Sequence, residues 1–374
     1  MIILQISPEF EAGTGVGGVV HCLEEAWRGK GHDVRRFGPE EAGLHWLTGT
    51  GSGMVGRLRH MVRVIAFSTV GTARAKRAIT QLPDDAVVIC HNDALVGDVY
   101  VNHGILEMAM RARGHYRWRM VRNPLHLFTA ARDRVRYRAN VHRVVVNLTR
   151  ADEDALRRVY SRIAPRTVVI GNGVDIGRFR PPTPEERLEA RSRLDLDPES
   201  LVTVFVGNEF ERKGLFPLVE AVSAAHERHH LVVVGGTPDM LDHLGRVARQ
   251  HGLDRRLHAV GPHDPLPYLW AADLLAQPSA YESYGLVVTE ALAAGVPVLS
   301  TPVGVAPDVI DDGSNGFLTD GSAQDIAAAL ARLSVADLPA MRLAARQSVA
   351  GHTWDRISDT YLGLFADLVR AEVS

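Results

Sequence analysis

The chain has few of the features that would indicate a secreted, membrane-spanning or disordered protein. It contains two cysteines in 374 residues, Cys22 and Cys90, so nothing suggests a disulfide framework and a reducing cytosol is favoured. No apolar run approaches the ~20 residues that span a bilayer. The amino terminus lacks a basic segment followed by a cleavage site, and its pattern is that of a first β-strand. We therefore expect a cytoplasmic protein that is neither exported by a signal peptide nor integral to a membrane.

Composition and patterning predict two globular domains. The sequence is 46% hydrophobic and has no low-complexity tract, which suffices for two cores of ordinary size. Short apolar segments alternate with amphipathic ones from Ile2 to Ile170, and a second alternating set runs from Val202 to Leu318. Such alternation is typical of parallel sheets covered by helices on both faces. The predicted fold class is α/β, with two doubly wound Rossmann-like domains.

Proline content and one late amphipathic segment predict the domain boundaries. Three prolines within four positions follow Arg180, and because they remove backbone donors they favour an extended linker near residue 178. Beyond Thr353, apolar residues recur at spacings of three and four, which predicts a final helix that buries one face on a folded domain. The predicted parts are an N-terminal domain at 1–177, a C-terminal domain at 178–352 and a terminal helix at 353–374.

Two glutamates, Glu282 and Glu290, lie eight positions apart at the start of a predicted helix. Glu282 follows the predicted strand 273–277, and apolar residues at helical spacing begin at Tyr284. The free N–H groups of a helix N-terminus attract anions. Glu290 lies roughly 10 Å further along the axis at about 1.5 Å per residue, a distance that suits the diphosphate and ribose of one nucleotide sugar. A solvated surface pair is the alternative that spacing alone leaves open.

The residues around this pair resemble the Glu-x7-Glu signature of retaining GT-B glycosyltransferases, glycosyltransferase family 4. The similarity runs from Tyr-Glu-Ser-Tyr-Gly-Leu to Ala-Ala-Gly-Val-Pro-Val, over residues 281–298. It implies that Glu282 contacts the donor sugar and that Glu290 binds the ribose hydroxyls. It also implies two domains that face a cleft, a first domain that binds the acceptor, a second that binds the donor, and a terminal helix that crosses back to the first. The further donor-binding residues that it implies are Ser283, Tyr284, Gly285 and Leu286.

A basic pair, Arg212 and Lys213, follows the first predicted strand of the second domain. This is the position where open α/β sheets bind ligands. Lys213 is one of only three lysines in the chain, and a helix-start lysine without a role is the alternative. The family resemblance implies that this pair contacts the donor diphosphate. Many family members also have an arginine directly after the glycine equivalent to Gly207, where this chain has Asn208.

Two further elements of the first domain are candidates for the donor site. The run Gly-Thr-Gly-Val-Gly-Gly that begins at Gly13 fits the dinucleotide pattern Gly-x-Gly-x-x-Gly, but a match that does not directly follow its strand is weak. The resemblance implies instead a first loop in which the backbone of Gly17 and Gly18 approaches the donor phosphates, where a side chain would collide. His103 follows a predicted strand and resembles the family histidine that binds the donor sugar. His91 resembles an earlier histidine segment of the family, although its gap to His103 is shorter than usual.

Charge is distributed unevenly along the chain. Residues 1–175 carry a net charge of +8 and residues 176–374 carry −10, counting Lys, Arg, Asp and Glu. Between residues 111 and 143, ten arginines accompany a single acid, Asp133. Basic amphipathic segments of this kind, and of the kind at 54–77, can lie on anionic lipid, which predicts peripheral association with the inner face of a membrane. A solvated arginine-rich helical face is the alternative.

These observations predict a metal-independent, retaining glycosyltransferase of bacterial type. It would move a sugar from a UDP- or GDP-sugar to a hydroxyl of a glycan, glycolipid or small molecule by front-face substitution, without a cofactor. We find no clustered ligand spacing for a metal and expect no nucleic-acid partner. The predicted catalytic residues are His103, Arg212, Lys213 and Glu282. The alternatives are a sugar-nucleotide epimerase, a phosphorylase, a non-catalytic nucleotide-binding GT-B protein and a dinucleotide-dependent dehydrogenase.

Overall fold

The computed structural model describes residues 1–13, 15–47 and 53–373. The chain folds into two compact units. Unit 1 comprises Met1–Gly173 together with Trp354–Ser374, and unit 2 comprises Val174–Thr353. Nothing in the described residues has the combination of helix length and apolar composition that crossing a bilayer requires.

Unit 1 is built on a six-stranded parallel sheet with the strand order β2-β1-β3-β4-β5-β6. The strands are β1 (Ile2–Ile6), β2 (Asp33–Phe37), β3 (Val87–His91), β4 (Val99–Asn102), β5 (Val144–Asn147) and β6 (Arg166–Val169). The central strands are rich in valine and isoleucine and fully buried, as expected for parallel strands covered on both faces. The prediction of a parallel sheet is therefore confirmed for this unit.

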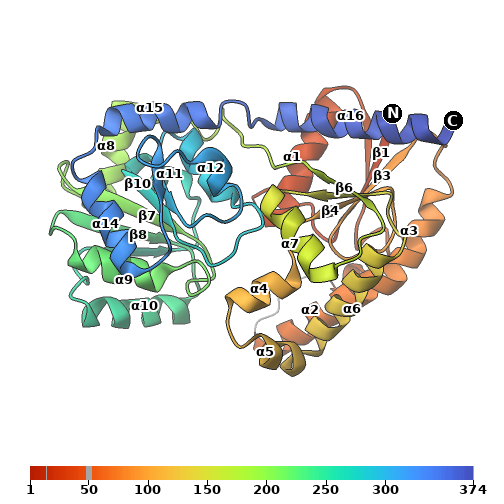
Figure 1. Ribbon diagram of the computed structural model, residues 1–374, viewed down its shortest axis with the longest axis horizontal. Helices are drawn as coiled ribbons and strands as arrows, with labels where there is room; N and C mark the ends of the chain where they lie inside the picture. The colour runs from red at the N-terminus through yellow and green to blue at the C-terminus, as the bar shows by residue number, and fades with distance from the viewer. Residues whose placement is uncertain (14, 48–52, 374) are drawn as a thin grey trace. The chain divides into compact units, whose positions relative to one another are not determined.

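Helices cover both faces of the sheet of unit 1 (Figure 1). They are α1 (Gly15–Gly29), α2 (Gly53–Ala66), α3 (Thr72–Ile79), α4 (Leu106–Ala112), α5 (Tyr116–Arg122), α6 (Pro124–Arg138), α7 (Arg150–Tyr160) and α16 (Trp354–Val373), with a short 3-10 turn η1 (His45–Leu47) and a π-helical segment η2 (Phe67–Gly71) between α2 and α3. The sequence patterning predicts no individual helix between residues 103 and 143, where the structure has α4, α5 and α6. In that region arginine interrupts the apolar spacing on which the prediction depends.

The helix predicted beyond residue 353 is α16, and it packs against α1 (Figure 1). Trp27 of α1 is fully buried between the rings of Tyr361 and Phe365, at centroid distances of 5.8 and 5.4 Å. The indole N–H of Trp27 donates to the carbonyl of Ser358 at 3.3 Å. The last segment of the chain therefore completes the core of the unit that contains the first residues.

Unit 2 repeats the design with the strand order β12-β11-β10-β7-β8-β9, again parallel throughout. The strands are β7 (Leu201–Val206), β8 (His229–Val234), β9 (Leu257–Gly261), β10 (Leu274–Gln277), β11 (Val298–Ser300) and β12 (Gly316–Leu318). The helices are α8 (Pro184–Ser192), α9 (Leu215–Ala224), α10 (Pro238–Gln250), α11 (Leu266–Ala271), α12 (Leu286–Ala293), α13 (Ala306–Val309), α14 (Ala323–Leu333) and α15 (Leu338–Ser348). The order reverses between β10 and β7, and such a switch point is where open α/β sheets bind ligands.

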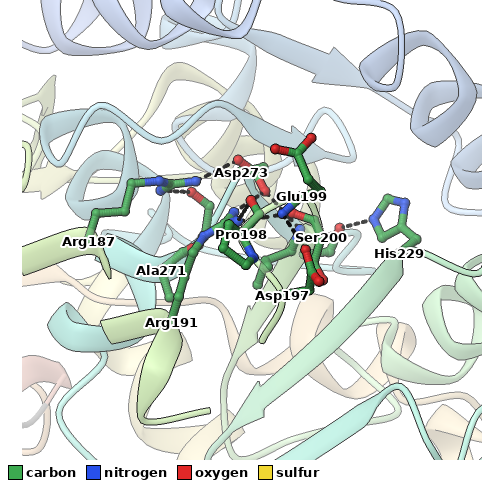
Figure 2. Close-up of polar contacts among 12 residues, drawn as sticks. Arg187, Arg191, Asp197, Pro198, Glu199, Ser200, His229, Ala271 and Asp273 are labelled. Carbon is green, nitrogen blue, oxygen red and sulfur yellow. Dashed lines mark hydrogen bonds and ion pairs between the residues drawn. The ribbon is translucent and has the colours of Figure 1, made fainter. Parts of the chain in front are cut away.

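A buried carboxylate, Asp273, ties the outer helices of unit 2 to the amino-terminal ends of its strands (Figure 2). Its oxygens accept hydrogen bonds from Arg187 and Arg191 of α8 at 2.7 and 2.6 Å, and from Arg342 of α15 at 2.8 Å. The backbone N–H of Val202 in β7 also donates to it, at 2.9 Å. This network stabilises the amino-terminal edge of the sheet. A ligand site is expected at the opposite, carboxyl-terminal edge, where the loops of open α/β sheets bind ligands.

Candidate functional site

The loops that follow β7 and β10 meet at the carboxyl-terminal edge of unit 2. The two strands are neighbours in the sheet, and the N–H of Ala280 donates to the carbonyl of Arg212 at 2.8 Å. The guanidinium of Arg212 in turn donates to the carbonyl of Tyr281. Gly214 makes this approach possible, because it has a φ of +76° and a Cβ there would overlap the carbonyl oxygen of Pro278. Gly214 therefore allows the loops after β7 and β10, which are far apart in the sequence, to lie side by side.

The two loops bring Arg212, Lys213 and Glu282 into one cluster. The Nζ of Lys213 lies 3.0 Å from Oε1 of Glu282, and Nη1 of Arg212 lies 3.7 Å from the same oxygen. The hydroxyl of Ser279 donates to that oxygen at 2.9 Å. All three charged side chains are mostly buried, with exposed fractions of 13 to 17%. Burial disfavours the charge on Arg212, but Glu282 and Glu209 more than offset this and raise the pKa of its guanidinium.

The helix that carries the second glutamate, α12, begins later than the sequence predicts. The structure starts it at Leu286 rather than at Tyr284, because Gly285 has a φ of +89°, which a right-handed helix cannot continue. Ser283 and Tyr284 consequently lie in the loop, and Gly285 is the N-cap residue. The first N–H groups of α12, from Leu286 onward, have no intrahelical acceptor and point out of its N-terminus.

Glu290 lies in the second turn of α12 and is partly buried. Its carboxyl group makes no hydrogen bond to any residue that the structure describes. Burial raises the pKa of this carboxyl to about 7, although Arg178 and Lys213 oppose the shift and Asp264 adds to it. An acceptor group that is available and close to ionisation at neutral pH suits recognition of hydroxyl groups.

Arg178 and Asp264 form an ion pair at 2.9 Å, and both charges influence the pKa of Glu290. The sequence did not predict this ion pair. Asp264 lies in the loop after β9 and Arg178 lies in the predicted linker, 86 positions earlier in the chain. A cavity of about 250 Å³ adjoins this loop, between Asp264, Tyr268 and the end of α8. No sequence signal links these segments, because the sheet order that brings them together is a tertiary property.

The glycines predicted to approach the donor phosphates lie within unit 1. Gly17 and Gly18 are in the first turn of α1, which begins at Gly15, so their prediction as loop residues is wrong. Thr14, in the same predicted loop, lies outside the described residues. The first N–H groups of α1 still lack intrahelical acceptors, and a helix N-terminus of this kind favours an anion.

His103 follows β4 directly and faces a second histidine, His91, at the end of the neighbouring strand β3. The Nδ1 of His91 and the Nε2 of His103 are 2.9 Å apart, and the rings are stacked with centroids at 5.2 Å. His91 is fully buried, whereas His103 is partly exposed. Burial lowers the pKa of His103 to about 4 and, with the neighbouring His103, lowers that of His91 well below its usual value. Both rings are therefore neutral at pH 7.

Three comparisons with known proteins bear on this arrangement. Residues 200–335, which contain the cluster of Arg212, Lys213 and Glu282 as well as Glu290, match the sequence profile of the family described as glycosyl transferases group 1. This segment is therefore similar to the group 1 glycosyltransferase domain. The D-inositol 3-phosphate glycosyltransferase of Actinosynnema mirum is 36% identical over 257 residues, which cover 63% of this chain and 60% of that protein. The chain spans about three fifths of the length of this relative and of two further D-inositol 3-phosphate glycosyltransferases that it matches.

Similarity to solved structures extends over nearly the whole chain and establishes the GT-B fold. Sucrose-phosphate synthase from Thermosynechococcus elongatus superposes with a TM-score of 0.77 over 99% of both chains, at 19% sequence identity. HepE of Anabaena, solved in complex with UDP and glucose, superposes with a TM-score of 0.68 over 97% of this chain and 99% of its own, at 20% identity. The predicted resemblance and fold class are confirmed.

The arginine-rich segment of this GT-B protein is less exposed than the sequence predicts. Arg136 of α6 is fully buried and donates to Asp133 at 2.8 Å and to the carbonyls of Asn92 and Ala94. Arg132 is mostly buried and pairs with Asp93 at 2.7 Å. The reading of all ten arginines as one basic surface is therefore wrong for these two, because α6 packs its basic side chains on the loop that follows β3. The exposed members are Arg111, Arg117, Arg122, Arg134 and Arg138.

Carboxylate and imidazole groups are dispersed in the GT-B fold. Within residues 1–13, 15–47 and 53–373, no group of three or more His, Cys, Asp or Glu side chains is arranged to hold a metal ion. The positive charge at the cluster comes from Arg212 and Lys213, and each of these cations already contacts Glu282.

Proposed function

We propose that the protein is a glycosyltransferase that takes a sugar from a nucleotide-diphosphate donor and attaches it to a hydroxyl group with retention of anomeric configuration. The observation that carries this proposal is the cluster of Lys213, Arg212 and Glu282, with Glu290 on the helix that follows. It combines two cations, a helix N-terminus and two carboxylates in one unit, which is what a sugar, a diphosphate and a ribose together require.

Arg212 and Lys213 would bind the donor diphosphate and stabilise the negative charge that develops as it departs. Electrostatic stabilisation of a leaving group by fixed cations is usually a large contribution to catalysis. Their present partner, Glu282, would then be free to accept hydrogen bonds from the sugar, which is attached next to the diphosphate. This exchange of partners keeps the cations paired whether or not the donor is bound.

The environment of Glu282 favours front-face substitution over a covalent intermediate. Its Oε1 lies within 3.0 Å of Lys213 and accepts a hydrogen bond from Ser279, while Arg212 lies 3.7 Å away. In the proposed donor complex Glu282 keeps the hydrogen bond from Ser279 and accepts others from the sugar hydroxyls in place of the two cations. A carboxylate held by several donors is a poor nucleophile. In front-face substitution the departing phosphate oxygen accepts the proton of the acceptor hydroxyl, so no enzyme nucleophile is needed. This chemistry requires the charges of Arg212 and Lys213 and is proposed to proceed without a metal ion.

The donor proposed for the first test is a UDP-sugar, because the Anabaena structure with the same fold contains UDP and glucose. GDP-sugars are the second class of donor to be tested. The Actinosynnema relative is named as a D-inositol 3-phosphate glycosyltransferase. A phosphorylated polyol is therefore a further candidate acceptor, beside glycans, glycolipids and small molecules. His103 is proposed to contact the transferred sugar, and the first turn of α1, with Gly17 and Gly18, to contribute N–H groups to the donor phosphates.

Binding of UDP and GDP measured by calorimetry tests the donor site. Lys213→Met should weaken the binding of the preferred nucleotide about 10- to 100-fold, the equivalent of about 1.5 to 3 kcal/mol for a hydrogen bond to a charged group. Lys76→Met, which removes an exposed lysine of α3 in unit 1, is the matched control and should leave binding unchanged. Equal affinities for all three proteins would refute the assigned site.

Incubation with a panel of UDP- and GDP-sugars and candidate acceptors tests the reaction. A glycosylated product whose anomeric configuration, measured by NMR, matches that of the donor is expected. The rate should be insensitive to EDTA. Epimerised donor without transfer would identify the epimerase alternative, and tight nucleotide binding with no product from any acceptor would favour a non-catalytic protein.

We also propose that unit 1 associates with an anionic membrane through a basic and apolar patch on α2, α5 and α6. These helices are neighbours in unit 1 (Figure 1). The segments 42–83 and 108–132, which include α2, α5 and the first half of α6, contain no aspartate or glutamate. The exposed members of the patch are Val55, Leu58, Trp118, Val121 and Leu127 together with Arg57, Arg117 and Arg122.

Charge complementarity favours a lipid surface as the partner of this patch. Apolar side chains that insert among acyl chains and arginines that reach phosphate headgroups describe an interfacial helix, and each basic residue near such a surface contributes about 1 kcal/mol. Arg122 stacks on the ring of Trp118 at 4.6 Å, which places a cation beside the side chain most suited to the interface.

Sedimentation with vesicles tests this association. Binding is expected to vesicles that contain phosphatidylserine, to weaken with added salt, and to be lost in Val121→Asp. The matched control is Leu188→Asp, which alters another exposed apolar residue, on α8 of unit 2. Binding that is absent, or that is reduced equally by both substitutions, would contradict the proposed patch.

A further inference from the structure

A pair of histidines in unit 1 forms a contact whose proton arrangement can be worked out from burial. The Nδ1 of His91 and the Nε2 of His103 are 2.9 Å apart, so one of the two nitrogens donates a hydrogen to the other. Both rings are neutral at pH 7, since burial lowers the pKa of each. Each ring therefore carries one proton, and the position of one proton determines the position of the other.

The second nitrogen of His91 distinguishes the two possible arrangements. The Nε2 of His91 is buried and has no hydrogen-bond partner among the residues that the structure describes. If His103 donated to His91, that nitrogen would carry a buried N–H without an acceptor, which costs about 1–3 kcal/mol and is rare in proteins. If His91 donates, the same nitrogen holds only an unshared lone pair. Donation from His91 to His103 is therefore the favoured arrangement.

We propose that His91 is a positioning residue that holds His103 in the tautomer protonated at Nδ1. Because its Nε2 accepts from His91, the ring of His103 must carry its proton on the opposite nitrogen. That Nδ1 makes no hydrogen bond to any described residue, and His103 is the partly exposed member of the pair. The pair thus presents a neutral, oriented N–H donor at the carboxyl-terminal edge of the sheet.

The loop after His91 is held rigidly enough to support this role. Asn92, the next residue, has a φ of +65°, which is uncommon outside glycine. The buried guanidinium of Arg136 donates to the carbonyls of Asn92 and Ala94, and Arg132 pairs with Asp93. Two arginines, which a protein rarely buries, therefore converge on the three residues that follow His91 and hold this loop in place.

The chemical consequence rests on the proposed glycosyl transfer, in which His103 contacts the transferred sugar. A neutral N–H donor suits a sugar hydroxyl or a phosphate oxygen, whereas a histidine with its proton on Nε2 would present only an acceptor there. His91 would then determine which group of the ligand His103 can bind, without touching the ligand itself.

Long-range ¹⁵N–¹H NMR of the histidine-labelled protein tests the tautomer without any assay of activity. The signals of His103, identified by their disappearance in His103→Gln, should show a protonated Nδ1 and an unprotonated Nε2. In His91→Leu, which removes the donor, the ring should revert to the Nε2-protonated form that free imidazole side chains prefer. His91→Asn, whose amide N–H can replace the Nδ1 donor, should keep the wild-type tautomer.

A matched control separates this effect from the loss of any buried histidine. His142 is also buried in unit 1, donates from Nδ1 to the carbonyl of Gly97 at 3.0 Å, and has an Nε2 without a partner among the described residues. His142→Leu should destabilise unit 1 to about the same degree as His91→Leu, but it should leave the tautomer of His103 unchanged. A protonated Nε2 in wild-type His103, or the same tautomer in wild type and His91→Leu, would overturn the inference.

Kinetics extend the test once a donor and an acceptor are known. His91→Leu should lower kcat by up to about 100-fold with little change in the KM for the donor, and His91→Asn should restore most of the loss. Equal kinetics in wild type and His91→Leu would refute the role in turnover. Failure to find any transferase activity would instead count against the proposed function, because the NMR result does not depend on it.

Discussion

Replacing Glu290 by glutamine should stabilise unit 2 at alkaline pH and have little effect near pH 4.5. Glutamine has nearly the same shape as glutamate but cannot ionise, so the substitution removes the cost of keeping a carboxylate partly buried. That cost is present in the wild-type protein because the carboxyl group makes no hydrogen bond to the described residues and its pKa is raised by burial. The stabilisation is therefore expected to depend on pH in a defined direction.

The size and sign follow from the shift in pKa. The carboxyl has a pKa of 4.5 when unperturbed and about 7 in the folded protein, so the folded state holds this proton more tightly than the unfolded state. Between these values the folded state binds more protons, and the free energy of unfolding falls as the pH rises. The full loss above pH 7 is at most about 3.5 kcal/mol, since the shift is about 2.5 units and one unit of pKa corresponds to about 1.4 kcal/mol. Partial exposure of Glu290 makes this an upper limit.

Hydrogen exchange of peptides from β10 to α12, measured in a pH series with correction for the intrinsic exchange rate, reports this stability locally. The difference in opening free energy between Glu290→Gln and wild type should grow from near zero at pH 4.5 to its maximum above pH 7. Glu220→Gln, at an exposed glutamate of α9 in the same unit, is the control and should show no such trend. A difference that stays flat across the series would refute the raised pKa and the burial argument behind it.

Three further substitutions test other parts of the structure. Asp273→Asn should destabilise unit 2 by about 3–5 kcal/mol in urea unfolding, because it leaves three arginines around an uncharged group. Trp27→Ala should destabilise unit 1 by about 3–5 kcal/mol and speed proteolysis within α16, whose rings pack on the indole; unchanged cleavage would contradict that packing. Gly214→Ala should separate the loops after β7 and β10 and weaken calorimetric binding of UDP or GDP, and full binding would show that the close approach is dispensable.

The sheets were predictable because their strands are local patterns, whereas several helices were not. Runs such as residues 87–91 are apolar and β-branched and end at polar residues, so their boundaries can be placed within a residue or two. The helices α4, α5 and α6 follow no clear apolar period, since arginine supplies both their exposed faces and part of their interior. A guanidinium that is buried because it meets a carboxylate from another segment cannot be recognised before that segment is placed.

The same limit applies to the site. Motif order identified Lys213 and Glu282 separately, but their ion pair joins residues 69 positions apart and exists because β7 and β10 are adjacent in the sheet. Arg178 and Asp264 were not among the predicted site residues, because their influence on Glu290 follows from folding. Gly17 and Gly18 were placed in a loop because the family resemblance implies a first loop there, yet the helix that follows begins before them.

The pairing of Lys213 with Glu282 bears on how the site would distinguish a sugar nucleotide from a nucleotide alone. A mostly buried lysine is costly without a counterion, and Glu282 supplies one when no ligand is bound. A nucleoside diphosphate that attracted Lys213 would leave Glu282 without its strongest partner, whereas a sugar on the same diphosphate would offer hydroxyl donors to that carboxylate. Under the proposed function the cluster would therefore favour the intact donor over the nucleotide product, and this difference would help the product to leave.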